Sequence, residues 1–279
     1  MAWFVPFFGV AAAASIGGLV KWRANDTRDD LNEMARLAAM QPSDPPPFAL
    51  DSVADLPEPA RRYFAYLIAE GTPTWRVAEL EMEGEFGMGD NSSPNYLDME
   101  ATQVLAAPHG FVWKMRAGRG AFRMSGSDSA SWTRFWLAGV IPVARLGGTL
   151  DHRRAAFGRY VAEAAFWTPA AFLPGPGVSW KAVADDCARV TVDHDGLSQS
   201  VDIFIARDGR PIRVEFDRWS DANPEKTYRI QRFGGYLSEF EQFDGFTLPT
   251  RVEAGNFFGS DDYFAFFKAK VTAVRFPKA

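Results

Sequence analysis

Three polar side chains that could act together lie on one predicted helix. If residues 152–166 are helical, His152, Arg159 and Glu163 fall within about 40° of one another on one face. An imidazole, a guanidinium and a carboxylate in such a group can hold the polar head of a ligand. Either His152 or Glu163 could also act as the general base of a hydrolase. The same pattern fits a solvated helix face with an i,i+4 ion pair between Arg159 and Glu163.

Aromatic residues are the second unusual feature, because 24 Phe and nine Trp exceed what a minimal core requires. A thick β-sheet core and a groove for an apolar ligand are the two explanations. A Trp- and Pro-rich connector follows the predicted helix and would suit a lid on such a groove. We therefore predict that Trp113, Trp167 and Trp180 line or cover the ligand, while His152, Arg159 and Glu163 fix its head.

The motifs of common enzyme and metal-binding families are absent. The sequence has no phosphate-binding glycine loop, no zinc-protease motif and no nucleophile elbow. Its single cysteine, Cys187, excludes an intrachain disulfide and a Cys-rich zinc site, and its three histidines lie far apart. We predict no metal site and no cofactor. No catalytic residue can be assigned, so the sequence does not identify an enzyme.

The charge balance disfavours nucleic acid as a partner. The net charge is −5, whereas a general nucleic-acid binder is usually basic. Four basic residues between 114 and 123 form the one local exception.

The elements that must position these residues are mainly strands. Apolar and polar residues alternate from residue 75 onward, and Asp-Gly turns separate alternating runs at residues 195–196, 208–209 and 244–245. Short turns give antiparallel neighbours, and helices set apart from the strands indicate the α+β class. We predict a long curved, half-barrel-like antiparallel sheet of about ten or eleven strands, covered by helices near residues 57–70 and 152–173.

An apolar N-terminus precedes this domain. Residues 1–20 carry no charged side chain, and twenty helical residues span about 30 Å, the thickness of a bilayer core. We predict that residues 1–22 anchor the chain in a membrane, with a cleaved signal peptide and a buried helix as alternatives. Residues 23–54 then form a short helix and a Pro-rich linker, and residues 55–279 form one domain. A bacterial inner membrane is the expected location, with the side of the domain undetermined.

Several short motifs resemble a bacterial family of proteins of unknown function. They are Leu56-Pro57-x-Pro59, Ser125-Gly126-x-Asp128, Gly158-Arg159 with Glu163, Trp167-x-Pro169, Leu173-Pro174 and Val178-x-Trp180. The resemblance covers roughly residues 55–276 and implies no activity and no catalytic residues. The expected architecture is also similar to that of lipoprotein and lipid carriers of the cell envelope.

These observations favour a membrane-anchored protein that binds a lipid or another apolar ligand in a groove of the sheet. A partner-binding envelope or assembly module and a hydrolase using His152 or Glu163 are the alternatives. Neither the ligand nor a protein partner can be named from the sequence.

Overall fold

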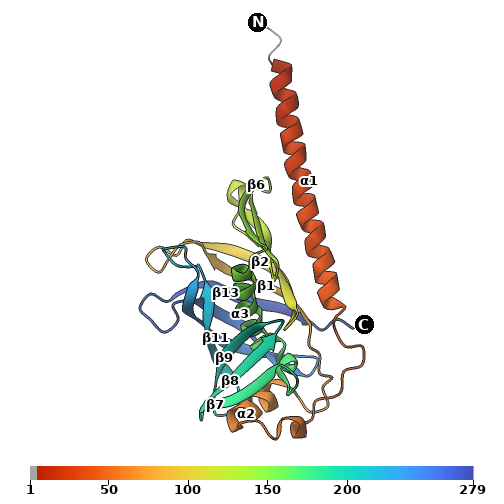
Figure 1. The fold of residues 1–279 in the computed structure, drawn as a ribbon, viewed down its shortest axis with the longest axis vertical. Coiled ribbons are helices and arrows are strands. Elements are labelled where there is room, and N and C mark those ends of the chain that lie inside the picture. Colours follow the sequence, from red (N-terminus) through yellow and green to blue (C-terminus); the bar gives the residue numbers. More distant parts are fainter. Residues whose placement is uncertain (1–4, 279) are drawn as a thin grey trace.

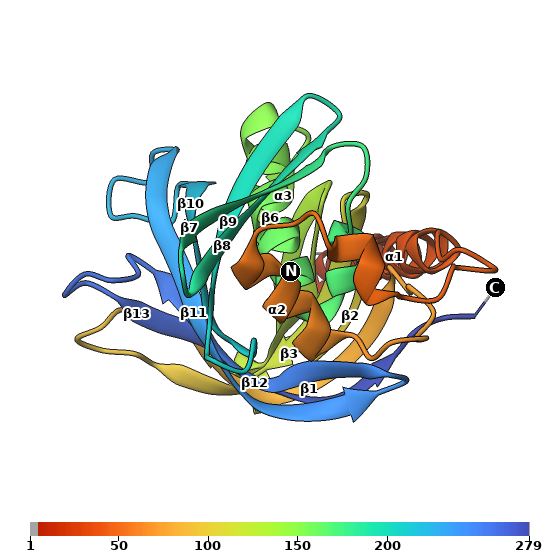
Figure 2. The same ribbon diagram turned by 90° about the horizontal axis from the view of Figure 1, so that it is seen from below.

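The computed structural model describes the backbone of residues 5–278 and the side chains of residues 17–278. Its thirteen strands form one antiparallel sheet that curls into a deep trough (Figures 1 and 2). The strands are β1 (Ala78–Gly87), β2 (Tyr96–Ala106), β3 (Gly110–Ala117), β4 (Met124–Ser129), β5 (Trp132–Leu137), β6 (Ile141–Gly147), β7 (Val178–Ala184), β8 (Cys187–His194), β9 (Leu197–Ile205), β10 (Pro211–Ser220), β11 (Arg229–Phe243), β12 (Phe246–Asn256) and β13 (Phe264–Arg275).

The order of the strands follows the chain, with one exception. Strands β1 to β6 run as a meander to one edge, and β12 back to β7 run as a second meander to the other edge. The last strand, β13, pairs with both β1 and β12 and so joins the two arms at the centre of the sheet.

Three α-helices surround or fill the trough. Helix α3 (Leu150–Trp167) connects the edge strands β6 and β7 and lies inside the curl, mainly against β9 and β10 (Figure 2). Helix α2 (Glu58–Leu67) packs on β7, β8 and β12 and covers one end. Helix α1 (Val5–Ala38) rests on β2 and β3 and projects past the domain (Figure 1).

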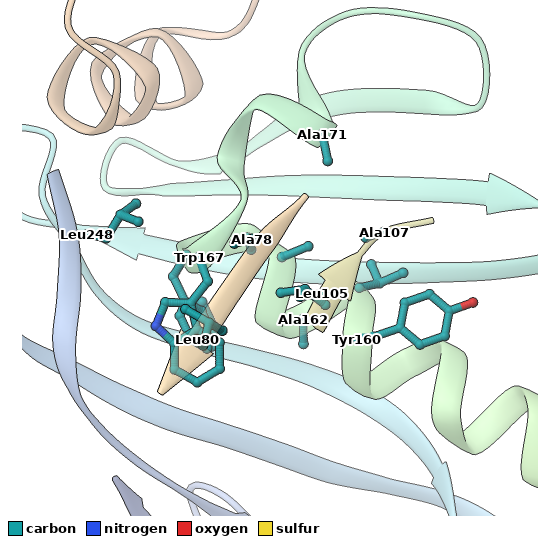
Figure 3. Packing of buried hydrophobic residues seen from close by; sticks show 14 of the residues in the cluster. Ala78, Leu80, Leu105, Ala107, Tyr160, Ala162, Trp167, Ala171 and Leu248 are labelled. Atoms are coloured by element: carbon teal, nitrogen blue, oxygen red, sulfur yellow. The ribbon is translucent and has the colours of Figure 1, made fainter. Parts of the chain in front are cut away.

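The two faces of the sheet bury different residues. Along β1, Leu80 and Met82 face the buried interior while the intervening glutamates face outward. Figure 3 shows Tyr160 and Trp167 of α3 together with Leu80 and Leu105 of the sheet in this interior cluster. On the outer face, Val104 and Val112 meet Leu37 of α1 in a smaller cluster.

The predicted α+β class and the curved antiparallel sheet are confirmed. The predicted hairpin around Asp208-Gly209 is also present, formed by β9 and β10. The sheet has thirteen strands instead of about ten or eleven, because the sequence pattern did not predict β5 and β6. Strand β6 is an edge strand that leaves Ile141, Val143 and Leu146 exposed, so it lacks a clear alternation between buried and exposed residues.

The N-terminal helix differs in detail from the expectation. Helix α1 runs without a break through the boundary expected at residues 22–23. The Pro-rich segment after it is fixed on the domain, because buried Gln41 bonds to the backbone of Arg76 and Val77. The predicted membrane anchor falls largely on residues whose side chains lie outside the described part. Among the helices described, none combines the length and apolar character of a membrane span.

A buried carboxylate holds α1 on the sheet. Asp26 accepts hydrogen bonds from Arg134, Arg145 and the Trp136 indole. Burial raises the pKa of Asp26, but these hydrogen bonds and the two arginine charges outweigh it and lower the pKa overall. Trp22 packs edge-on against Trp136, with ring centroids 5.4 Å apart.

Replacing Asp26 should therefore loosen α1. We expect Asp26→Ala to lower the free energy of unfolding by roughly 3–5 kcal/mol, the usual cost of leaving buried partner charges unpaired. Amide hydrogen exchange in α1 should also become faster. Asp29→Ala is the matched control, since Asp29 also contacts Arg134 but is 50% exposed against 8% for Asp26. Equal effects of the two substitutions would contradict this role of Asp26.

Candidate functional site

A cavity of about 550 Å³ lies between α3 and the inner face of the sheet. Strands of both arms contribute to its wall, and most of the wall is apolar. The apolar residues include Phe86, Met88, Trp113, Met115, Phe135, Phe166, Trp167, Val214, Phe216, Phe233, Val252, Phe266 and Phe267. The space persists beside α3 because the helix presents small side chains there, namely Ala155, Ala156 and Ala162.

The mouth of the cavity is marked by lining residues that remain exposed. Met88, Val143 and Leu146 are each about half exposed and belong to the β1–β2 loop and to edge strand β6. Helix α2 covers β7 and β8 at the other end of the trough (Figure 1). The cavity is therefore accessible from the side of β6.

An ion-pair network joins α3 to β4 at the wall. Arg159 donates to Asp128 at 2.6 Å and to Glu163 at 2.7 Å, and Gln103 donates to the second oxygen of Glu163 at 2.6 Å. Burial lowers the pKa of Arg159, but the charges of Glu163 and Asp128 outweigh it and raise the pKa overall. The Arg159 guanidinium also lies 4.9 Å from the ring centroid of Trp113. The Arg159 guanidinium is thus already paired with two carboxylates.

His152 joins the network through a hydroxyl group. The Thr133 hydroxyl lies 2.5 Å from an Asp128 oxygen and 3.1 Å from His152 Nε2. A hydroxyl has one proton to donate, and the carboxylate is its stronger acceptor. The hydrogen-bond pattern therefore assigns the His152 proton to Nε2, while buried Nδ1 has no partner among the described residues. Burial lowers the pKa of His152, which keeps the imidazole neutral at pH 7.

The structure brings five of the six predicted binding residues to this cavity. His152, Arg159, Glu163, Trp113 and Trp167 all line it, whereas Trp180 lies elsewhere.

Trp180 packs against Tyr63 and Phe64 of α2, and its indole donates to the Phe172 carbonyl at 2.9 Å. The connector after α3 thus packs into the core by α2 instead of covering the cavity. That any of the six residues binds a ligand remains a prediction.

Sequence reasoning missed Arg218, a charged residue of the cavity wall. Arg218 lines the cavity from β10, where it follows Val214 and Phe216 at intervals of two. Alternation along a strand puts such residues on one face, so a cation in this series signals an interior charge. Asp128, Gln103 and Thr133 were also missed, since each gains its role from partners distant in the sequence.

A second hollow, of about 600 Å³, lies outside the sheet between α1 and β1–β5. Its lining is largely charged, and several of those charges pair with one another across it, as Asp26 does with Arg134. In the part of the chain that the structure describes, no three metal-ligating side chains come together in either hollow.

The neutral state of His152 predicts a pH dependence of stability. The unfolded chain takes up a proton on this residue near its ordinary pKa of 6.5, whereas the folded protein resists protonation. The unfolded state then binds more protons, so stability falls as the pH drops through this value. Gln can keep the bond to Thr133 without titrating. We expect His152→Gln to lose less stability than the wild type between about pH 7.5 and pH 5.5, measured by urea unfolding. Equal losses would show that the fold does not hold this imidazole neutral.

The comparison with curated proteins finds no match for this chain. Three solved structures are similar at 10% identity. A LolA superfamily protein from Nitrosomonas europaea has a TM-score of 0.41, with 78% of this chain and 91% of that chain covered. A putative outer membrane lipoprotein-sorting protein domain from Vibrio parahaemolyticus has a TM-score of 0.35 and coverages of 81% and 91%. A DUF1329 family protein from Desulfovibrio piger has a TM-score of 0.37 and coverages of 88% and 92%.

The expected likeness to envelope lipoprotein carriers is thus found only at TM-scores below 0.5, and nothing about the activity of this protein follows from it. The comparison of the sequence with protein families is more informative. Residues 46–269, most of the chain, match the model of a family of unknown function, DUF6544. The protein therefore belongs to the DUF6544 family.

Proposed function

We propose that this protein binds a lipid or another ligand with a long apolar part in the cavity between α3 and the sheet. The observation that carries the proposal is the apolar cavity itself, open beside β6 and bounded by a few polar side chains. Small-molecule sites generally have this form, with volumes of roughly 300–1,000 Å³. A protein whose trough served only as a hydrophobic core would fill it to the density of other protein interiors.

The two cavity tryptophans are placed to contact the apolar part of a ligand. Trp113 packs between Phe135 and Phe267 in edge-to-face contacts, and Trp167 is anchored by its indole bond to the Pro249 carbonyl. Both rings are thus held in fixed positions by the surrounding protein. Rigid aromatic walls reduce the ordering cost of binding.

The network of His152, Arg159 and Glu163 forms the polar side of the proposed site. Its members are held by Asp128, Thr133 and Gln103, so their positions do not depend on a ligand. His152 Nδ1 is buried and has no partner among the described residues.

The hydrolase alternative finds less support in this geometry. Thr133 is the hydroxyl in contact with His152, but its proton is directed to Asp128, so the imidazole does not activate it. A general-base role would have to act on a bound water through Nδ1.

Partner binding is the second candidate function, and edge strand β6 is the observation that favours it. This strand exposes Ile141, Val143 and Leu146, and its outer backbone edge is unpaired in the sheet. Val143 and Leu146 also border the mouth, so a protein docked there could transfer ligand to the cavity. We retain the membrane attachment of residues 1–22 as part of this proposal, since it would place the mouth near a source of lipid.

A substitution that fills the cavity tests the proposed function. Ala254 lies on the inner face of β12 and lines the cavity, whereas Ala273 lies on the outer face of β13, opposite Glu81. We expect Ala254→Phe to weaken binding of the neutral dye N-phenyl-1-naphthylamine at least about 10-fold, because the phenyl ring occupies the space.

Ala273→Phe is the matched control and should leave the affinity unchanged, with thermal unfolding confirming that both variants fold. Dye fluorescence that does not increase with the wild-type full-length protein, or that is equal in both variants, would overturn the proposal. Native mass spectrometry of the full-length protein then identifies any lipid that copurifies.

A further inference from the structure

We propose that Arg218 binds the anionic head of the ligand, which makes the ligand a long-chain carboxylate or phosphate monoester and not a neutral lipid. The inference rests on the proposed function, because it names the class of molecule for the same cavity. The assignment follows from the position of Arg218 and from the state of every other charge around it.

Arg218 is an interior cation without a protein partner. It lies on the face of β10 that also carries Val214, Phe216 and Ser220, all of which turn toward the cavity. Its guanidinium forms no hydrogen bond or ion pair with any residue of the described chain, and its Nε is buried and unsatisfied. The guanidinium carbon lies 5.0 Å from the ring centroid of Phe233. The two Nη groups, which are not among the buried atoms, thus have four N–H donors available to a ligand.

The other arginine of the cavity is not available in this way. Arg159 directs its Nε and one Nη at Glu163 and Asp128, at 2.7 and 2.6 Å. An anion that approached Arg159 would have to compete with both carboxylates. The two arginines therefore differ in role: Arg159 fixes α3 to β4, and Arg218 is open to binding.

The nearby carboxylates do not neutralise Arg218. Burial is the main cause that lowers its pKa to about 10, and the positive charge of Arg159 adds to the shift. The attractions of Asp128, Glu163 and Asp221 oppose this shift without cancelling it. Arg218 remains protonated at pH 7, and its buried Nε has no acceptor in the described chain, which costs free energy while no anion is bound. An anionic ligand group would restore the missing partner.

One cation without a protein partner and a largely apolar lining together define the chemical class of the ligand. A guanidinium pairs with a carboxylate or phosphate through two parallel hydrogen bonds. The remaining lining around Phe216, Phe233 and Phe266 offers contact to hydrocarbon. A molecule with one terminal anionic group and a single apolar chain fits both features.

The test compares anionic and neutral ligands of one chain length in the full-length protein. Hexadecanoate, hexadecyl phosphate and 1-hexadecanol each displace N-phenyl-1-naphthylamine from the wild type and from Arg218→Met. We expect the methionine variant to bind at least one of the two anions roughly 10- to 100-fold more weakly, the loss typical of a hydrogen bond to a charged group. Its affinity for hexadecanol and for the dye should stay within about two-fold. The anion that loses more affinity identifies the head group as carboxylate or phosphate.

Two controls separate this role from a structural one. Arg213→Met removes a cation from the outer face of the same strand and should change no ligand affinity. Arg218→Lys should restore part of the preference for anions. The unfolding midpoint of ligand-free Arg218→Met should equal or exceed that of the wild type, because the variant removes an unpaired buried charge.

The outcomes also distinguish the two proposals. If the dye binds but Arg218→Met leaves the preference between anion and alcohol unchanged, the inference about Arg218 is overturned while the cavity remains a binding site. A lower unfolding midpoint with unchanged preference would make Arg218 a distant counterion of Asp128 and Glu163. If the dye does not bind the wild type at all, the proposed function itself fails.

Discussion

The placement of α3 inside the curled sheet is the constraint on which the rest of the structure depends. The helix can lie close to β9 and β10 because Gly158 faces them, where a Cβ atom would come within 2.8 Å of Gln199. Phe157 and Val161 are buried in the core around the helix, whereas Ala155 and Ala162 face the cavity. Small side chains there cannot reach the opposite wall of a sheet this wide. The cavity is therefore a consequence of how bulky and small residues are distributed around one helix.

Charges inside the trough fall into two kinds. Arg159, Asp128 and Glu163 satisfy one another, so their burial costs less than that of isolated ions and they hold α3 in register with β4. Arg218 has no such compensation and stays as an unpaired cation in an apolar wall. Proteins retain destabilising groups of this kind mainly where a function requires them.

The sequence predicted well what alternation and helical periodicity encode. The face of α3 that carries His152, Arg159 and Glu163 was found because an α-helix places such residues together, and the hairpin at Asp208-Gly209 because that turn has a strong local signal. Strand β6 was missed because an edge strand need not alternate. Asp128 and Gln103 could not be found because their partners lie on other elements. Trp180 was misplaced because the path of the connector depends on α2, against which it packs. The position of Arg218 two residues after Phe216 on one strand could have predicted that it faces the interior.

The central place of β13 has a consequence for the order in which the chain can fold. Strand β1 pairs with β13, so residues near 80 wait for residues near 270 before their hydrogen bonds are complete. During synthesis the two meanders can form separately, each with one unpaired edge more than in the complete sheet, and β13 then joins them. Contacts of such long range make folding slow, and they leave the nascent protein open to mispairing until β13 has left the ribosome.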